Sequence, residues 1–176
     1  TDDKGFFSEE RRNCIHDYAT IGDGIPAYKL TNTCEDGRYK IEKTIIADPR
    51  RNVLLQQIVF TPLKGKLSDY KLFALASPHL LNAGFGNDGY VGEYKGVNLL
   101  FATRHNHTLA IGASTPFSKM SVGYVGHSDG WQQLKNDGDL KQVYTKADNG
   151  NIALTGQIDL EACEGKFTIA LSFGSI

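Results

Sequence analysis

Apolar and polar side chains alternate along most of this chain, and a period of two residues predicts β-strands rather than helices. In 39–47, for example, Tyr39, Ile41 and Lys43 fall on one face, and Lys40, Glu42 and Thr44 fall on the other. Strands are expected at 25–33, 39–47, 53–61, 69–77, 90–94, 97–103, 107–113, 152–160 and 167–173, with a shorter candidate at 140–144. No long amphipathic helix is expected, and 131–135 fits a single helical turn.

Turn-forming residues separate these stretches. Asp36-Gly37, Asp48-Pro49 and Lys95-Gly96 each stand between two predicted strands. The run Asp148-Asn149-Gly150-Asn151 is a type I′ signal and predicts a hairpin. Residues 78–89 are expected to form a long Gly- and Asn-containing loop. Loops of this length in compact domains are often functional, and a plain surface excursion fits the pattern equally well.

Many short strands with turns about every 8–12 residues are typical of antiparallel all-β proteins. Residues 1–24 carry no strand signal and are expected to be irregular. We find no linker-like composition that would divide the chain, so 1–176 is interpreted as one domain, a large two-sheet sandwich.

The densest group of unusual residues is 121–131, which ends in the only tryptophan, Trp131. The apolar start of this stretch predicts a strand that leaves its sheet at Gly126. A turn containing His127 and Asp129 then carries Trp131 to a fixed position. The turn could be a site or a packing corner, and the corner is favoured because a lone tryptophan usually packs.

Composition narrows the choice of partners. The net charge is −1, which predicts neither nucleic-acid binding nor attraction to an anionic membrane. No apolar run reaches the roughly 20 residues that a membrane helix needs. The three cysteines, Cys14, Cys34 and Cys163, are widely spaced, so one disulfide with a free thiol and three reduced thiols both remain open.

Candidate catalytic chemistry is weak. Hydrolysis of a glycoside needs paired carboxylates, but the available aspartates stand in turns, where they usually cap backbone groups: Asp129, Asp137, Asp139 and Asp148. His105 and His107 would share a face of one strand, yet no third metal ligand is evident. Gly84-x-Gly86-x-x-Gly89 matches a dinucleotide-binding pattern, but no helix is expected to follow it. No cofactor is expected, although an Asp/Asn-rich turn could hold calcium.

Aromatic side chains offer a further candidate function, because exposed rings can stack on sugars. The rings concerned are Tyr90, Tyr94, Tyr124, Trp131 and Tyr144. The sequence does not show which of them are exposed, and most are expected in the core.

Several segments, taken in order, resemble one known family. They are Asp36-Gly37-Arg38-Tyr39-Lys40-Ile41, Asp48-Pro49-x-Arg51-Asn52, Leu63 to Leu72, Pro78-His79-Leu80, Gly123-Tyr124-Val125-Gly126-x-x-Asp129-Gly130-Trp131-Gln132-x-Leu134, Gly150 to Gly156 and Phe167 to Gly174. Together they resemble the N-terminal domain of prokaryotic glucoamylases and glucodextranases, the family-15 glycoside hydrolases.

This resemblance implies a large antiparallel super-sandwich of the kind also found in galactose mutarotases. In the family, the domain precedes a catalytic barrel of paired helices that carries both catalytic glutamates, so no catalytic residue carries over to this chain. The family's domain has strands upstream of the segment like 7–11, and the chain is therefore expected to be incomplete at its N-terminus. A secreted or periplasmic location is expected ahead of a cytoplasmic one.

Three functions compete. The first is a non-catalytic module that supports the barrel of an exo-acting α-glucan hydrolase in the same polypeptide. The second is a module that binds α-glucan or maltooligosaccharide through Trp131 and neighbouring tyrosines. The third is a stand-alone mutarotase-like enzyme, for which only His79 and His127 could serve. The expected interdomain or carbohydrate-binding residues are Trp131, Tyr124, Asp129, His127 and His79.

Overall fold

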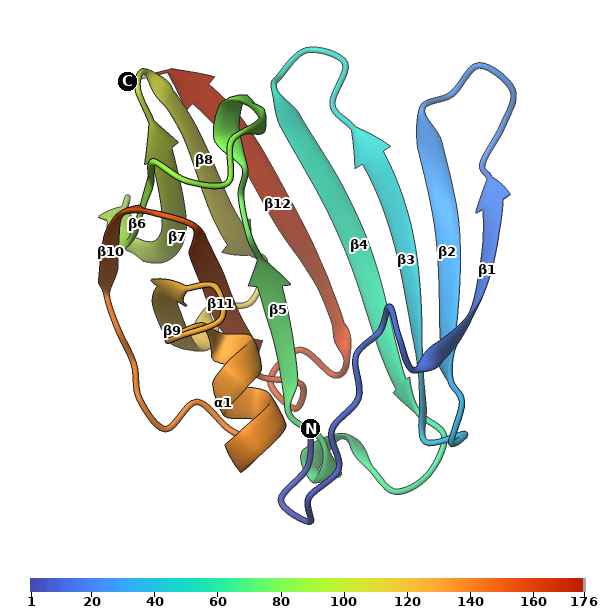
Figure 1. The fold of residues 1–176 in the computed structure, drawn as a ribbon. Helices are drawn as coiled ribbons and strands as arrows, with labels where there is room; N and C mark the ends of the chain where they lie inside the picture. The colour runs from blue at the N-terminus through green and yellow to red at the C-terminus, as the bar shows by residue number, and fades with distance from the viewer. Residues whose placement is uncertain (176) are drawn as a thin grey trace.

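The computed structural model describes residues 1–175 and consists mainly of two antiparallel sheets that face each other (Figure 1). Nine strands form the larger sheet, in the order β1-β2-β3-β4-β12-β8-β7-β6-β10. Three strands form the smaller sheet, in the order β5-β11-β9. The prediction of an all-β, two-sheet sandwich is confirmed.

The elements of this range follow each other without long irregular insertions. In chain order they are β1 (Cys14–Thr20), β2 (Ala27–Cys34), β3 (Tyr39–Ala47), β4 (Val53–Pro62), the 3₁₀ helix η1 (Leu67–Asp69), β5 (Leu72–Ala76), the 3₁₀ helix η2 (Leu80–Asn82), β6 (Asn87–Tyr94), β7 (Val97–Arg104), β8 (His107–Ala113), β9 (Phe117–Tyr124), α1 (Gly130–Asp137), β10 (Lys146–Gly150), β11 (Ile152–Ile158) and β12 (Lys166–Ser175).

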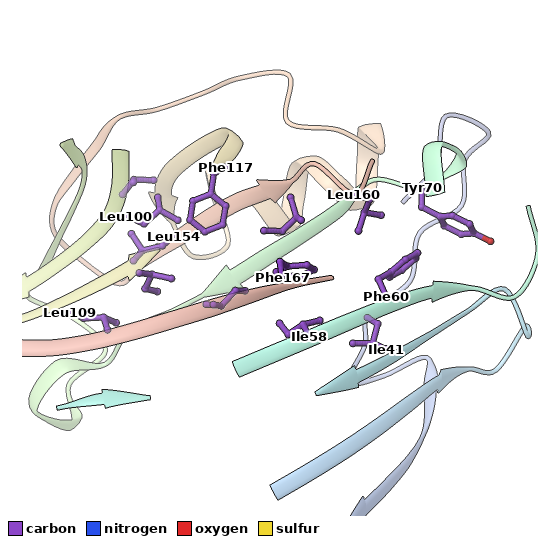
Figure 2. Close-up of a cluster of buried hydrophobic side chains, with 14 of the residues drawn as sticks. Ile41, Ile58, Phe60, Tyr70, Leu100, Leu109, Phe117, Leu154, Leu160 and Phe167 are labelled. Carbon is purple, nitrogen blue, oxygen red and sulfur yellow. The ribbon is translucent and has the colours of Figure 1, made fainter. Parts of the chain in front are cut away.

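Apolar side chains from both sheets meet in one core. Figure 2 shows Leu100 of β7, Leu154 of β11 and Phe117 of β9 gathered between the strands, and Leu100 and Leu154 are each 1% exposed. The sheets approach closely at Gly89 of β6. A Cβ placed there would lie 2.7 Å from Cδ1 of Ile152, so a larger residue would push the sheets apart.

The larger sheet has an apolar inner face and a polar outer face. On β3, Tyr39 and Ile41 are buried inward, whereas Glu42 points outward and pairs with Lys29 and Lys40. This arrangement confirms the two-residue alternation read from 39–47. A face built in this way requires a covering layer to keep its apolar side chains from water.

The smaller sheet covers only part of that inner face. In Figure 1 its strands lie over β12, β8, β7 and β6, while no strand in the described range lies in front of β1, β2 and β3. The N-terminal segment crosses one end of these strands, where Ser8 bonds the Tyr39 hydroxyl (2.7 Å) and Glu10 pairs with Lys43 (2.5 Å).

The other end of β1–β3 stays uncovered within residues 1–175. Tyr18 opposes Leu30, and Tyr28 opposes Ile45, so the four side chains share the inner face. Tyr18 is 80% exposed and Tyr28 is 49% exposed. We call Tyr18, Tyr28, Leu30 and Ile45 the uncovered face. It lies beyond the free edge of β5, which is the end strand of the smaller sheet.

Some expectations were wrong. Residues 14–20 form strand β1 and are not irregular, and 140–144 contains no strand. The helix α1 spans eight residues rather than one turn, and β9 ends at Tyr124, before Gly126. The proposed hairpin at 148–151 does not exist, because β10 pairs with β6 while β11 pairs with β5 and β9. The chain passes from one sheet to the other at this corner.

The first residues are held in place by a buried carboxylate. Asp2 is 6% exposed, and its Oδ1 accepts hydrogen bonds from the backbone N–H of Lys4 (2.8 Å) and of Phe6 (2.7 Å). Its Oδ2 accepts from the guanidinium of Arg38 (2.8 Å). Burial by itself would raise the pKa of Asp2, but these hydrogen bonds and the Arg38 charge outweigh it and lower that pKa.

We expect Asp2→Asn to lower the free energy of unfolding at pH 7 by about 1–2 kcal/mol, because charge-assisted bonds are lost. A carboxylate with a lowered folded-state pKa stabilises the fold above its unfolded pKa, about 3.9, and loses this contribution as pH falls through the folded value. The difference in free energy of unfolding between the parent and Asp2→Asn should therefore shrink below about pH 4. Urea unfolding at pH 7, 5 and 3 measures it.

Asp3→Asn is the matched control for this experiment, because the Asp3 side chain is 79% exposed and, among the basic groups of residues 1–175, pairs only with Lys71. It should change the free energy of unfolding by less than about 0.5 kcal/mol at each pH. An Asp2→Asn deficit that stayed constant down to pH 3 would contradict the role assigned to the carboxylate charge.

Candidate functional site

The stretch 121–131 makes a close turn at one end of the smaller sheet. After β9 ends, the N–H of His127 donates to the Tyr124 carbonyl (3.0 Å), and Ser128 Oγ accepts from the Tyr124 N–H (3.0 Å). The turn folds back onto β9, so a Cβ on Gly123 would lie 2.1 Å from the Ser128 carbonyl oxygen. Only glycine allows this approach.

Asp129 links the turn to the helix. It is 5% exposed and forms the N-cap of α1, where Oδ1 accepts from the Gln132 N–H (2.8 Å). Its other oxygen accepts from the Gly126 N–H. The helix ends at Gly138, which has a left-handed φ of 72° and donates its N–H to the Leu134 carbonyl. Both oxygens of Asp129 are therefore used in holding backbone.

Asp129→Ala is expected to lower the free energy of unfolding by about 2 kcal/mol, because two buried backbone donors lose their acceptor. Asp137→Ala, at the exposed end of the same helix, should change it by less than about 0.5 kcal/mol. Chemical denaturation followed by circular dichroism compares the two. Equal effects would mean that the cap does not hold the turn.

Trp131 is half-buried on α1. Its ring meets Phe7 edge to face (centroids 6.1 Å apart), and the Lys135 ammonium lies 4.8 Å from its centroid. It therefore joins the N-terminal segment to the helix. The ring borders a groove of about 360 Å³, which is also lined by Arg12, Leu75 and Gln132.

Tyr124 supports the corner where the chain changes sheets. Its hydroxyl donates to the Asp148 carbonyl (3.1 Å) and accepts from the Asp148 N–H (3.0 Å). Its ring lies against Gly150, where a Cβ would come within 2.6 Å of it. The ring is 38% exposed.

His79 and His127 are both exposed and lie at the same end of the smaller sheet, after β5 and after β9. Asn151 lies between the two turns, since Ser77 donates to its side chain (3.4 Å) and Val125 donates to its carbonyl (2.9 Å). The structure thus brings these two segments to one end of the sheet. It gives neither histidine an acidic partner in the described range.

The other chemical candidates have structural partners. Asp137 pairs with Lys141, Asp148 pairs with Lys146, and Asp139 bridges Lys71 (3.2 Å) and Lys119 (2.9 Å). Although burial opposes it, the two lysines lower the pKa of Asp139. His105 lies in a turn and His107 on β8, so they do not share one strand. The Gly84–Gly89 pattern leads into strand β6, not into a helix.

Within residues 1–175, no three or more His, Cys, Asp or Glu side chains come together in a group that could hold a metal ion. None of the helices described is long and apolar enough to span a bilayer.

Comparison with known families gives a match along the chain. The model of the family described as glucodextranase, domain N, covers residues 1–176. This chain belongs to the glucodextranase domain N family. The resemblance read from the sequence is confirmed.

Two relatives of this domain N show how it sits in longer proteins. A glucoamylase from Clostridium sp. (strain G0005) is 35% identical over 175 residues, which are 99% of this chain and 25% of that glucoamylase. The crystal structure of a bacterial glucoamylase complexed with acarbose matches with a TM-score of 0.95 at 34% identity, over 98% of this chain and 25% of that one. The chain spans about a quarter of the length of these relatives.

One feature of the domain was not expected from its sequence. Asn87 is fully buried and organises the loop before β6: its Oδ1 accepts from the Leu80 N–H, and its amide donates to the carbonyls of Ala83 (2.8 Å) and Gly84 (3.0 Å). Leu81 in this loop has a positive φ of 56° and is 54% exposed. Backbone strain of this kind clusters at functional segments, which makes this loop a candidate contact segment.

Proposed function

We propose that this domain N is a non-catalytic part of a glucoamylase-like hydrolase, which releases glucose from the ends of α-glucan chains. Its role is to support the catalytic barrel carried by the same polypeptide. The uncovered face carries this proposal, because apolar side chains on one side of a sheet are stable only when another layer covers them.

Two further observations favour a covering layer from the same polypeptide. The domain spans a quarter of the length of its relatives, which leaves room for a large additional part. The edge of β5 that pairs with no described strand faces β1–β3, and within residues 1–175 only the N-terminal segment lies between them, so the uncovered face is open to a further layer. The exposed Leu81 lies outside this face and offers a second contact.

The first test is the mass of the native polypeptide, measured by immunoblot against this domain. We expect a band about four times heavier than 19.3 kDa, in keeping with its relatives. A single band near 19.3 kDa would overturn the proposal, since no barrel would then share the polypeptide.

The second test changes the uncovered face in the full-length polypeptide. Tyr18→Glu places a charge on the inner face, and Ala19→Glu places the same charge on the outer face of the same strand. We expect Tyr18→Glu to speed thermal inactivation of glucan hydrolysis by about tenfold, because the charge must be desolvated under the covering layer. Ala19→Glu should lose glucan hydrolysis on heating at the same rate as the parent. Equal behaviour of the two variants would contradict a covered inner face.

A second candidate function is binding of maltooligosaccharide at the groove beside Trp131. The groove combines an aromatic ring with polar side chains from Glu9, Arg12 and Gln132, and such mixed linings suit ligands with both apolar and hydroxylated surfaces. Trp131→Ala should then weaken maltooligosaccharide binding at least tenfold in calorimetry. Phe7→Ala, which removes the same ring contact but keeps the indole, should bind as the parent does. Binding that survives Trp131→Ala would exclude this groove.

A further inference from the structure

Cys14 and Cys34 stand directly opposite each other on the two strands of the first hairpin. Cys14 begins β1, Cys34 ends β2, and the register pairs their Cα atoms. Both side chains point to the inner face and are buried, with 5% and 3% exposure. The sequence left their pairing open, and the fold places them together.

The hydrogen-bond pattern identifies the type of pair. The Glu35 N–H donates to the Asn13 carbonyl (3.0 Å), so Asn13 and Glu35, which are next to Cys14 and Cys34 on the two strands, form a hydrogen-bonded pair. Because the two types alternate along an antiparallel ladder, Cys14 and Cys34 form a non-hydrogen-bonded pair, with Cα atoms about 4.5 Å apart. This separation falls within the range that disulfides span, and the side chains project to the same face.

We propose that Cys14 and Cys34 are a site of oxidative modification, at which exchange with a small disulfide such as oxidised glutathione forms an intramolecular disulfide. One cysteine thiolate attacks the glutathione disulfide, forms a mixed disulfide and releases one glutathione thiolate. The second cysteine thiolate attacks the protein sulfur of that mixed disulfide and releases the other. The two cysteines lose two electrons and two protons, and oxidised glutathione becomes two reduced molecules.

Access to the sulfurs depends on β1. This strand is an edge of the larger sheet, so it can separate from β2 without disrupting other pairs. In the closed state, Cys14 Sγ lies 3.4 Å from the Tyr39 hydroxyl, and burial raises the pKa of the thiol more than this hydrogen bond lowers it. Exchange therefore proceeds through opening of the edge strand, and the disulfide then fixes β1 to β2.

The test is peptide mapping after the full chain has been incubated with oxidised glutathione and its remaining thiols have been alkylated under denaturing conditions. Trypsin places the three cysteines in separate peptides, 13–29, 30–38 and 147–166. We expect a linked pair of 13–29 and 30–38, about 2 Da lighter than the sum of the reduced peptides. The linked protein should melt higher than the reduced protein by about 5 °C or more.

Cys163 is the internal control, because it is half-buried on the connection between β11 and β12 and has no cysteine opposite it. It should be alkylated or carry a glutathionyl group, and Cys163→Ser should leave the 13–29/30–38 link unchanged. Cys14→Ser should abolish the link and leave Cys34 alkylatable or glutathionylated. Wild-type protein in which both cysteines stay alkylatable, or carry separate glutathionyl groups, would overturn the proposal.

Discussion

Gly123→Ala is expected to lower the free energy of unfolding by about 3 kcal/mol, one of the two largest effects predicted for a single substitution in this domain. The reason is backbone contact. A methyl group at Gly123 would lie 2.1 Å from the carbonyl oxygen of Ser128 and 2.9 Å from the N–H nitrogen of Asp129. Neither atom can rotate away as a side chain would, so the turn must leave β9.

Loss of this turn would also release the helix cap that Asp129 provides and the contact of Trp131 with Phe7. Urea unfolding followed by tryptophan fluorescence measures the effect, since Trp131 is the only tryptophan. Gly174→Ala is the control, because nothing lies within 4 Å of a Cβ there. It should shift the free energy of unfolding by less than about 0.5 kcal/mol. A Gly123→Ala protein as stable as Gly174→Ala would show that the turn does not fold against β9.

Leu154→Ala is expected to cost about 3–4 kcal/mol. Leu154 lies on β11, the central strand of the smaller sheet, and is 1% exposed in the core between the sheets (Figure 2). Its Cδ2 lies 3.3 Å from the point where a Cβ of Gly89 would stand, which places it directly against the larger sheet. Removing the side chain loses its burial and leaves a cavity that two rigid sheets cannot close.

Leu75→Ala is the matched control for Leu154. Leu75 lies on the neighbouring strand β5 but points to the opposite face of the smaller sheet and is 44% exposed. We expect its loss to cost less than about 1 kcal/mol in the same urea titration. If both substitutions cost the same, the smaller sheet would not be packed on the larger one as described.

The sequence predicted best those strands in which buried residues recur at every second position. The stretches 39–47 and 107–113 agree with β3 and β8 at both ends, because buried residues recur there at every second position, at Tyr39 and Ile41 in β3 and at Leu109 and Ile111 in β8. Strand β1 was missed. Its inner face carries His16, which bonds Asn32 (2.7 Å), and the uncovered Tyr18, while Ile15 points outward, so apolar and polar positions do not alternate.

The false hairpin at 148–151 has a different origin. The type I′ turn was wrong as well, since Asn149 has a positive φ of 50° but Gly150 does not, and both residues belong to β10. The partners of the two strands are set by distant contacts, such as the bond from the Asn149 N–H to Asp88 (2.7 Å) and the ring of Tyr124 over Gly150. No short-range pattern contains that information.

The helix α1, in contrast, could have been predicted in full. Asp129 is a favoured N-cap residue, a glutamine follows it three positions later, and Gly138 is a typical C-terminal residue. The grouping of His79 with His127 at one end of the smaller sheet could not have been predicted from the sequence, because it depends on the strand order β5-β11-β9. Their function stays a prediction.

The position of β12 sets the order in which this domain can fold. The last strand lies between β4 and β8, where Ile169 opposes Gln56 on one side and Ala113 on the other (Figure 1). The runs β1–β4 and β6–β8 can each form early from neighbouring strands, but the two halves join only after β12 has been synthesised. Until then a ribosome-bound chain exposes the edges of β4 and β8, which are open to pairing with other chains.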